Sequence, residues 1–494
     1  MALIDIKDLT FEYPGGIEPI FEKLNLQLDT AWKLGLIGRN GYGKTTFLKL
    51  LMGEYDYEGN IAKPVPMAYF PSTIKNKGNK TLEILERLQL DFQMWKLKME
   101  MNLLRVEEDI LYRPFCTLSG GEQTKVLLAL LFAGEKRFLL IDEPTNHLDS
   151  YSRDVVAKYL GNKDGFILVS HDREFVNSIV DHVLTIEKNK IVLQKGTYDT
   201  WEQNKNLEDK YELEQNQKLR KEIRRLRQSA REKSTWSDKV EATKIGSGPV
   251  DRGYIGHKSA KMMKRSKTIE KRYEKAIEEK SKLLKNIETI DKLQMNVLDH
   301  HAKQYIIAEN LTIAYERESI FRPIEFTIEK GDCIVFQGEN GSGKSSIIKA
   351  ILRQSIPWKG KLEIAKGLIM SYVPQKFDNI DGNINDFLWD KEVDKTKFLT
   401  ILRKLGFSRS QFDIPMENFS MGQKKKIFIA KSICEEANLF IWDEPLNYVD
   451  IISRIQIENM ILEFSPTMIV VEHDRRFVDR VATDIVQVRR VLGD

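Results

Sequence analysis

One set of motifs occurs twice in this chain at an almost constant interval. The pattern G-x4-G-K-[ST] lies at residues 38–45 and again at 338–345. An apolar run that ends in Asp-Glu at 142–143 returns at 443–444. The interval between the copies is therefore 300 or 301 residues in a chain of 494. A duplication of this length predicts two copies of one domain, each large enough to bury its own core.

Each motif follows an apolar stretch that is typical of a buried strand. In the first copy the stretches are WKLGLIG, RFLLIDE and FILVSH, and in the second they are DCIVFQG, NLFIWDE and MIVVEH. Helical stretches separate them, which favours an α/β fold with a mostly parallel sheet. We expect the first domain at residues 1–200 and the second at 303–494.

The segment between the copies, residues 201–302, has a different pattern. Its first part carries apolar residues at a four-three-four spacing, namely Leu219, Ile223, Leu226 and Ala230. Apolar residues at a similar spacing return between 269 and 290. This pattern predicts two long helices that pair as an antiparallel hairpin. Glycines and a proline predict its turn, or tip loop, near 243–257.

Positive charge is concentrated in the same segment. Residues 218–272 hold 18 Lys and Arg against 6 Asp and Glu, a net charge of +12 in a chain whose total is +4. A charge asymmetry of this kind predicts a polyanionic partner for the segment. The alternative for any single side chain is a solvated face of a coiled coil.

The remaining composition is that of a cytoplasmic protein without a membrane domain. No apolar run reaches the roughly 18 residues that a membrane-spanning helix needs, and the first residues, MALIDIKDLTFEY, lack the pattern of a signal peptide. The cysteines, Cys116, Cys333 and Cys434, are few and scattered. We expect all three to be reduced residues in or near the core.

The two glycine-rich loops are predicted to bind the phosphates of a nucleotide. Glycine allows backbone N–H groups to point inward around the phosphates, and the lysine adds a positive charge. A helix that begins at the loop further favours an anion there. The expected ligand residues are Gly38, Asn40, Gly41, Gly43, Lys44, Thr45 and Thr46, and in the second copy Gly338, Asn340, Gly341, Gly343, Lys344, Ser345 and Ser346.

The acidic pairs complete the predicted chemistry of each site. Asp142 and Asp443 end apolar runs, and we expect them to hold Mg²⁺ together with the hydroxyl groups of Thr45 and Ser345. Glu143 and Glu444 come next and are the candidate general bases that activate the attacking water. The alternative, an acid that only caps a helix, is weakened by the occurrence of Asp-Glu-Pro in both copies.

The sequence LSGGEQ at 118–123 resembles the LSGGQ signature of ABC ATPases. In that family the signature contacts the γ-phosphate bound by the opposite domain. The resemblance implies this role for Ser119, Gly120 and Gly121 in the first copy and for Ser420 and Gly422 in the second. The second copy, FSMGQK, departs from the family pattern because Met421 replaces a glycine.

The resemblance implies roles for five further residues. His171 and His473 match the family's switch histidine, which acts in catalysis by bonding the γ-phosphate. Tyr13 and Tyr315 occupy the place of the aromatic residue that stacks on adenine. Gln375 matches the glutamine of the Q-loop, which contacts the nucleotide and its Mg²⁺.

ABC domains pair head to tail, so the resemblance implies two composite sites. One site joins Lys44 to Ser420, and the other joins Lys344 to Ser119. The first site has Ser72 where the Q-loop glutamine is expected, and it uses the altered signature. We therefore predict that the Lys344 site hydrolyses ATP faster.

Two such domains joined by a long charged linker resemble the ABC-F family. Within it, the stretches WKLGLIGRNGYGKTT, RPFCTLSGGEQTKVLLALLF, KMMKRSK, FSMGQKKK and WDEPLNYVD resemble the Lsa-type antibiotic-resistance proteins. The resemblance implies a monomeric, cytoplasmic ATPase that pairs its own domains and binds the tRNA exit site of the 70S ribosome. It further implies displacement of lincosamides, pleuromutilins and streptogramin A. A translation factor without a resistance role, a transporter ATPase subunit and a DNA-repair ATPase are the open alternatives.

The same resemblance brings the linker close to 23S rRNA and the P-site tRNA. Basic residues expected to contact phosphates are Arg220, Arg224, Arg225, Arg227, Lys244, Lys261, Lys264, Arg265 and Lys267. The bulky residues of the tip loop are Pro249, Val250 and Tyr254. Compared with the Lsa pattern the tip is about one residue shorter and lacks a phenylalanine near its apex, which affects the range of drugs that the resemblance can imply.

Overall fold

The computed structural model describes most of the chain. The described residues are 2–491 except 15–18, 73, 90, 147, 188–189, 243–263, 265–267, 269–270, 274, 279, 281–290, 316–317, 378–381 and 390–392. The side chains of 230–242, 315, 318, 385, 389 and 410 also lie outside the described part. The chain divides into two compact units, one made of residues 1–199 with 290–494 and the other of residues 200–289. We call residues 1–199 the first half and residues 290–494 the second half.

The first half contains a six-stranded sheet and a smaller antiparallel sheet. The six strands are ordered β5-β6-β7-β3-β8-β9, and all neighbours are parallel except β8 and β9. The smaller sheet has the order β2-β1-β4. The strands are β1 (Leu3–Phe11), β2 (Phe21–Asp29), β3 (Lys33–Gly38), β4 (Glu58–Ala62), β5 (Met67–Phe70), β6 (Phe138–Asp142), β7 (Phe166–Val169), β8 (His182–Glu187) and β9 (Lys190–Lys195).

The helices of the first half lie between these strands along the chain. They are α1 (Lys44–Met52), α2 (Thr81–Leu88), α3 (Met94–Leu103), α4 (Gly120–Ala133), α5 (Ser150–Gly161) and α6 (Arg173–Ile179). Because β3, β6 and β7 are parallel neighbours, their carboxyl ends meet at one edge of the sheet. Ligand sites of parallel sheets lie at this edge, and the glycine-rich loop, the Asp-Glu pair and the His-Asp-Arg triplet all follow these strands directly.

The second half repeats the plan. Its main sheet has the order β15-β16-β17-β13-β18, and β10 pairs with β11, β12 and β14 in the smaller sheet. The strands are β10 (Gln304–Tyr315), β11 (Glu318–Ser319), β12 (Ile324–Glu329), β13 (Cys333–Gln337), β14 (Trp358–Ile364), β15 (Met370–Val373), β16 (Leu439–Asp443), β17 (Met468–Val471) and β18 (Asp484–Gln487). The helices are α9 (Lys344–Ile351), α10 (Ile384–Trp389), α11 (Lys395–Lys404), α12 (Met421–Cys434), α13 (Ile451–Phe464) and α14 (Arg475–Val481). The prediction of two α/β domains is confirmed.

The central strands are apolar throughout because both of their faces are buried. In β16, Leu439 and Ile441 join the cluster that contains α9 and β10. The alternate residues Phe440 and Trp442 join a second cluster with α12 and α13. Successive side chains of a strand point to opposite faces, so a strand covered on both faces reads as an unbroken apolar run. This arrangement fixes the carboxyl end of β16, where Asp443 and Glu444 follow.

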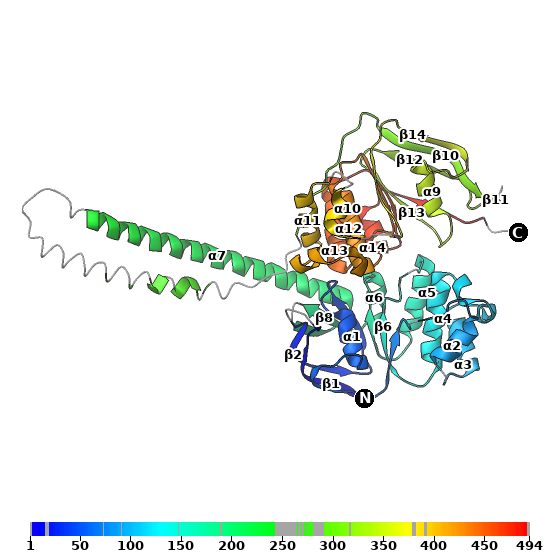
Figure 1. Cartoon of the computed structure of the whole chain (residues 1–494), viewed down its shortest axis with the longest axis horizontal. Coiled ribbons are helices and arrows are strands. Elements are labelled where there is room, and N and C mark those ends of the chain that lie inside the picture. The colour runs from blue at the N-terminus through cyan, green and yellow to red at the C-terminus, as the bar shows by residue number, and fades with distance from the viewer. Residues whose placement is uncertain are drawn as a thin grey trace, which may run out of the picture. The chain divides into compact units, whose positions relative to one another are not determined.

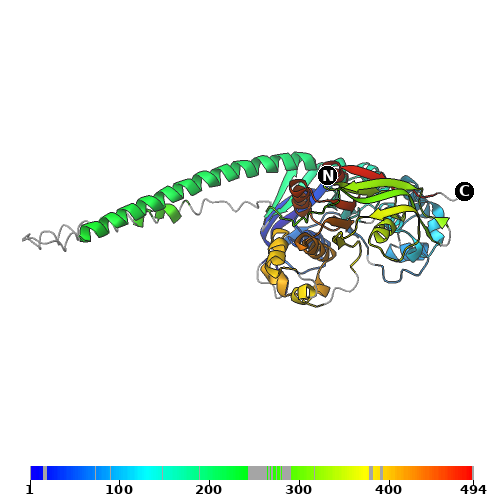
Figure 2. The ribbon, with the colours of Figure 1, turned by 90° about the horizontal axis from the view of Figure 1, so that it is seen from above.

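The linker begins with one long helix, α7 (Tyr198–Ala242), of 45 residues. Figure 1 labels it, and Figure 2 shows it as a continuous, gently curved helix. Its first turn is held by both halves of the chain. Tyr198 is fully buried, and the guanidinium of Arg476 lies 5.5 Å from the centre of its ring. Asp199 accepts a hydrogen bond of 2.7 Å from Asn177 and also pairs with Arg476.

Within the linker unit, the predicted apolar seam is partly described. Ile223 is buried, and Leu219 and Leu226 are half-buried, on the same side of α7. The described residues of the second arm (264, 268, 271–273, 275–278 and 280) are helical. Lys280, which interrupts the apolar spacing, forms an ion pair with Glu222 of the first arm. The long first helix is confirmed. Ala230 and most of the second arm and its turn lie outside the described side chains.

One expectation about the cysteines is wrong. Cys333 and Cys434 are buried as predicted, but Cys116 is exposed. Cys116 lies in a short turn before α4, where the chain runs over the surface, so no layer covers it. In the part of the chain that the structure describes, no helix is both long and apolar enough to cross a membrane.

Candidate functional site

Two pockets contain the repeated motifs, and residues of both halves line each of them. The Lys44 pocket has a volume of about 690 Å³ and the Lys344 pocket about 410 Å³. Predicted residues that line the Lys44 pocket are Tyr13, Asn40, Gly41, Gly43, Lys44, Thr45, Thr46, Asp142, Glu143, His171, Ser420 and Gly422. Those of the Lys344 pocket are Ser119, Gly120, Asn340, Gly341, Gly343, Lys344, Ser345, Ser346, Gln375, Glu444 and His473. The structure therefore brings together the two composite sets that the sequence predicts.

In the Lys44 pocket the phosphate loop is folded around its lysine. Gly41 and Gly43 have φ angles of 87° and 93°, a region that favours glycine. A Cβ atom on Gly43 would come within 2.6 Å of Ile20. The Lys44 Nζ donates hydrogen bonds to the carbonyl of Gly38 at 2.7 Å and to that of Arg39 at 3.2 Å. Helix α1 begins at Lys44, so its N-terminus faces the pocket and favours an anion.

The Lys344 loop has the same geometry. The Lys344 Nζ donates to the carbonyls of Gly338 and Glu339 at 2.7 and 2.8 Å. Gly343 has a φ angle of 97°, and a Cβ atom there would lie 2.8 Å from Phe321. Burial lowers the pKa of Lys344 and likewise that of Lys44. Both loops are therefore sites where a bound polyanion would be strongly favoured.

Asp142 ends β6 and accepts two hydrogen bonds. Thr45 Oγ1 donates to its Oδ2 at 2.9 Å, and the hydroxyl of Tyr69 donates to the same oxygen at 3.0 Å. Burial raises the pKa of Asp142, and the bonds from Thr45 and Tyr69 oppose this rise. A hydroxyl and a carboxylate directed at one point form the hard-oxygen donor set that suits Mg²⁺.

Asp443 is the equivalent residue of the second half. Burial raises its pKa to about 6. Its Oδ1 atom is buried and has no hydrogen-bond partner among the described residues. An unsatisfied buried carboxylate oxygen is costly, so this atom fits a ligand to Mg²⁺. Groups of three or more metal-binding His, Cys, Asp or Glu residues are absent from the described residues.

The two candidate bases have different surroundings. Glu143 Oε1 lies 3.4 Å from His171 Nε2. Burial, with a further contribution from Asp142, raises the pKa of Glu143 to about 8. Burial, and after it the charge of Lys44, lowers the pKa of His171 well below its usual value, so the imidazole is neutral at pH 7.

Glu444 is held by two amide donors. Gln375 Nε2 donates to Glu444 Oε1 at 2.7 Å, and Asn447 Nδ2 donates to Oε2 at 2.6 Å. His473 Nε2 is buried without a partner among the described atoms, and burial lowers the pKa of His473 to about 3. Glu143 and Glu444 both have positive φ angles, 52° and 48°, a strained conformation common at functional sites.

The signature serines begin helices α4 and α12. Ser119 Oγ accepts a hydrogen bond from the Glu122 N–H at 3.2 Å, and Ser420 Oγ accepts one from the Gln423 N–H at 3.3 Å. A hydroxyl group can also donate one hydrogen bond, and both serines line a pocket. Met421 lines the rim of the Lys44 pocket and is 46% exposed.

Gly422 has no space for a side chain. A Cβ atom there would lie 2.4 Å from the carbonyl oxygen of Tyr448 and 2.8 Å from the Nδ2 of Asn40. Asn40 donates to this carbonyl at 2.9 Å across the two halves. The one glycine that the altered signature retains is therefore the one that the packing requires.

Four predicted ligand residues, Gly38, Gly121, Gly338 and Asp443, do not line the pockets. Gly38 and Gly338 accept hydrogen bonds from the loop lysines, Gly121 is buried in α4, and Asp443 is buried at the end of β16. The side chain of Tyr315 lies outside the described residues. Tyr13 lines the Lys44 pocket, and its hydroxyl lies 2.8 Å from Thr46 Oγ1.

Sequence reasoning missed two residues that contact the acidic groups. Tyr69 bonds Asp142, and Asn447 bonds Glu444. The signal for Asn447 was present, because asparagine also occurs at 146, at the interval of 301 residues. Tyr69 is also repeated, as Tyr372, at an interval of 303 residues.

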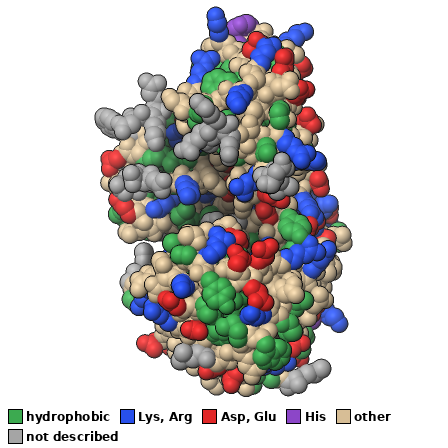
Figure 3. Space-filling model, turned by 90° about the vertical axis from the view of Figure 1, so that its right-hand side faces the viewer, with side chains coloured by type: hydrophobic (Ala, Val, Ile, Leu, Met, Phe, Trp, Pro, Cys, Tyr) green, Lys and Arg blue, Asp and Glu red, His purple; other side chains and the backbone are tan. Residues whose placement is uncertain are grey.

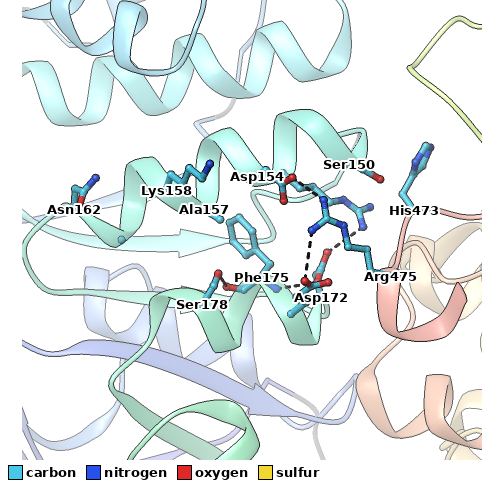
Figure 4. A pocket seen from close by; sticks show the side chains of 13 residues that line it. Ser150, Asp154, Ala157, Lys158, Asn162, Asp172, Phe175, Ser178, His473 and Arg475 are labelled. Atoms are coloured by element: carbon cyan, nitrogen blue, oxygen red, sulfur yellow. Dashed lines mark hydrogen bonds and ion pairs between the residues drawn. The ribbon is translucent and has the colours of Figure 1, made fainter. Parts of the chain in front are cut away.

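Equivalent arginines make unequal contacts between the halves. Arg173 of α6 pairs with Glu458 of α13, and these side chains are 5% and 0% exposed. Arg480 also bonds Glu458, at 2.8 Å. Arg475, the equivalent of Arg173, bonds Asp154 of α5 at 2.6 Å, with both side chains nearly half exposed. Figure 4 shows Arg475 and Asp154 at the wall of a third pocket, of about 380 Å³.

Comparison with known proteins agrees with this geometry. The family model described as "ABC transporter" matches residues 21–146 and 321–447. The chain is similar to the ribosome protection protein VmlR of Bacillus subtilis (strain 168), with 28% identity over 94% of this chain and 83% of that protein. It is 26% identical to the ATP-binding protein Uup of Buchnera aphidicola over 98% of this chain and 80% of that protein.

Solved structures show the same fold. A crystal structure of the archaeal ribosome recycling factor aABCE1 with the ribosomal stalk protein aP1 matches with a TM-score of 0.63. The match has 19% identity and covers 97% of this chain and 87% of that chain. At this identity the likeness concerns the fold alone.

Proposed function

This chain belongs to the ABC transporter family and is a tandem ABC ATPase of the ABC-F-like kind, and from that premise we propose that its ATP cycle acts on the ribosome. In this proposal residues 1–200 and 303–494 are the two ATPase domains, and residues 201–302 are the linker that contacts the ribosome. In a ribosome-bound role the chain works in the cytoplasm as a monomer that pairs its own domains.

The two ABC domains bind and hydrolyse ATP. In our proposal Lys44 and Lys344, with the N–H groups of their loops, hold the phosphates, and the serine of the opposite signature donates to the γ-phosphate. Glu444 accepts the proton of the attacking water, and Glu143 does so in its ionised form. The neutral His171 and His473 donate to the γ-phosphate as charge develops on it.

Mg²⁺ bound with ATP would be held by Thr45 and Asp142 in one pocket and by Ser345 and Asp443 in the other, where it would neutralise phosphate charge. The side chain of Gln375, also proposed as a ligand, already donates to Glu444. Through Nε2 it orients this base, and its amide oxygen is the atom that would ligate Mg²⁺. Among the described side chains, no amide donates to Glu143, which supports our proposal that the Lys344 pocket is faster.

The observation that carries the ribosomal role is the basic helix that leads out of the first half. On α7 the side chains of Arg220, Arg224, Arg225 and Arg227 are all exposed, as is Lys264 of the second arm. On the face that Figure 3 shows, acidic and basic side chains are interspersed. An exposed basic row suits phosphates of rRNA or tRNA, a contact that depends on salt and not on base sequence. Similarity to a protein named for ribosome protection supports the same role.

We propose further that the linker protects the 70S ribosome from lincosamides, pleuromutilins and streptogramin A, as in the Lsa-type proteins. The contacts would be made to 23S rRNA and the P-site tRNA. Lys244, Pro249, Val250, Tyr254, Lys261, Arg265 and Lys267 belong to this proposal but lie outside the described residues. Closure on two ATP molecules would admit the protein to the exit site, and hydrolysis would release it.

The test uses the Glu143→Gln/Glu444→Gln variant, which is expected to stay closed on ATP. It should sediment with 70S ribosomes in the presence of ATP and detach as salt rises. Expression of the unaltered chain in a drug-sensitive bacterium should raise the inhibitory concentration of at least one of the three drug classes. Absence of ribosome binding by the closed variant would refute the proposal and would favour a transporter subunit or a DNA-repair ATPase.

The second candidate is a translation factor without a resistance role, which would share the ATPase motifs of both pockets. Both candidates bind ribosomes, so only the drug measurement separates them. Ribosome binding with unchanged susceptibility to all three drug classes would favour this second candidate.

A further inference from the structure

Helix α12 carries two adjacent lysines in the interior of the protein. Lys425 is 1% exposed and Lys426 is 3% exposed. Burial of an ammonium group is costly unless hydrogen bonds and charges compensate it. The equivalent residues of α4 are Thr124 and Lys125. Lys426 therefore has a basic equivalent in the first half, whereas Lys425 has none.

Lys425 ties together the two segments that carry the chemistry of the Lys344 pocket. Its Nζ donates to the carbonyl of Pro374 at 3.0 Å and to that of Asp443 at 3.1 Å. The next residues along the chain are Gln375 and Glu444, whose side chains bond each other at 2.7 Å. One ammonium group thus fixes the backbone on both sides of this hydrogen bond.

The same helix begins in the other pocket. Ser420 and Gly422 line the Lys44 pocket, and Gly422 packs against the carbonyl of Tyr448, which accepts a bond from Asn40. Lys425 lies five positions after Ser420, an axial distance of about 7.5 Å along the helix. A shift of the start of α12 is therefore transmitted to the lysine.

Lys426 strengthens the connection. Its Nζ bonds the carboxylate of Asp450 and donates to the carbonyl of Leu405 at 2.7 Å. Asp450 caps the start of α13 by accepting from the Ser453 N–H at 3.0 Å. The first turns of α12 are thus anchored to the segment 448–450, which contacts the Lys44 loop. In the first half, Thr124 lines the Lys44 pocket and cannot reach as far as a lysine.

We propose that Lys425 is a positioning residue for hydrolysis in the Lys344 pocket and that, through α12, it couples this pocket to nucleotide bound in the Lys44 pocket. Nucleotide that engages Ser420 sets the position of α12, and Lys425 then sets the spacing between Gln375 and Glu444. The coupling runs in one direction only, because Thr124 stands at the equivalent position of the first half. The inference rests on the proposed roles of Gln375 and Glu444.

The test measures one pocket at a time. In a Glu143→Gln background, turnover comes from the Lys344 pocket. There, Lys425→Met and Lys425→Thr should lower kcat about tenfold to hundredfold, the range typical of a misplaced catalytic group, with KM for ATP changed less than about threefold. The threonine variant guards against a folding defect, since the equivalent position of the first half, 124, already holds threonine. Lys431→Met is the matched control, since Lys431 pairs with Glu435 in the last turn of the same helix, and it should leave kcat unchanged.

Coupling is tested with Ser420→Ala in the same background. This change should lower kcat of the Lys344 pocket when Lys425 is present and have no further effect when residue 425 is methionine. Multiplicative effects of the two changes would overturn the coupling, and an unchanged kcat in both Lys425 variants would overturn the positioning role. If Glu444→Gln in the Glu143→Gln background retained turnover, the assignment of the base would fail instead, which is a separate outcome.

Discussion

Replacing Arg173 with alanine is expected to weaken closure of the two halves far more than replacing its equivalent, Arg475. The two residues lie 302 positions apart and both reach across to the other half. Their surroundings differ. Arg173 pairs with Glu458 in the interior, whereas Arg475 pairs with Asp154 and, at 3.5 Å, with Glu174 at the surface.

The expected magnitudes follow from burial. Removing one partner of a buried ion pair typically costs about 3–5 kcal/mol. Arg480 remains on Glu458 after the change, so we expect a smaller loss of about 2–3 kcal/mol, or about 30- to 150-fold in the closing equilibrium. An exposed pair such as Arg475 with Asp154 contributes at most about 1 kcal/mol, or about fivefold.

The assay follows closure directly. One dye is attached to each half through introduced cysteines, in the Glu143→Gln/Glu444→Gln variant with the exposed Cys116 replaced. Energy transfer is recorded as ATP is added. The Arg173→Ala variant should need much more ATP to close, while Arg475→Ala should shift the midpoint slightly. High salt should abolish the small effect of Arg475→Ala, because exposed charges are screened within about 10 Å at 0.1 M salt.

The comparison can refute the reasoning in two ways. Equal shifts for the two arginine variants would mean that burial does not decide the strength of these contacts. A larger shift for Arg475→Ala would mean that the halves are held together mainly at the third pocket. Thermal unfolding of both variants controls for damage to the individual domains.

Three further outcomes are expected. Glu444→Gln should lower total ATPase activity at least about tenfold, as loss of a general base does, while the Glu143→Gln variant should retain most of the activity. A greater loss of activity in the Glu143→Gln variant would contradict the assignment of the faster pocket. Arg224→Ala and Arg225→Ala should each reduce the salt dependence of ribosome binding by about one counterion, measured by sedimentation at several salt concentrations, and an unchanged slope would exclude phosphate contacts. At pH 8.5 a thiol reagent should modify Cys116 alone in the folded protein, because burial raises the pKa of Cys333 and of Cys434 to about 12. At pH 8.5 these two cysteines therefore stay in the unreactive thiol form. Modification of all three without denaturant would contradict this.

The sequence predicted much of the fold because its signals are local and repeated. Apolar runs that end in functional motifs identified the central strands, and the resemblance to ABC ATPases implied which residues share each pocket. Lys344 and Ser119, for example, lie in one pocket although 225 residues separate them. The roles assigned to the residues of both pockets stay predictions.

Contacts that occur once, or that depend on packing, were not predictable. Arg173 and Glu458 are 285 residues apart, and the equivalent of Glu458 in the first half is Ala157, so no repeat marked the pair. Lys425 lies in a run of three lysines, which normally indicates a solvated face, and only the sheet beneath α12 buries it. The exposure of Cys116 likewise depends on a turn that no periodic pattern describes.

The buried root of α7 gives the linker the mechanics of a lever. Tyr198 and Asp199 are held by Asn177 of the first half and Arg476 of the second, so a change in the angle between the halves must turn the helix axis. A helix of 45 residues is about 68 Å long. A rotation of about 5° at its base would therefore displace its far end by about 6 Å. A small change in the angle between the halves would thus be amplified along the helix.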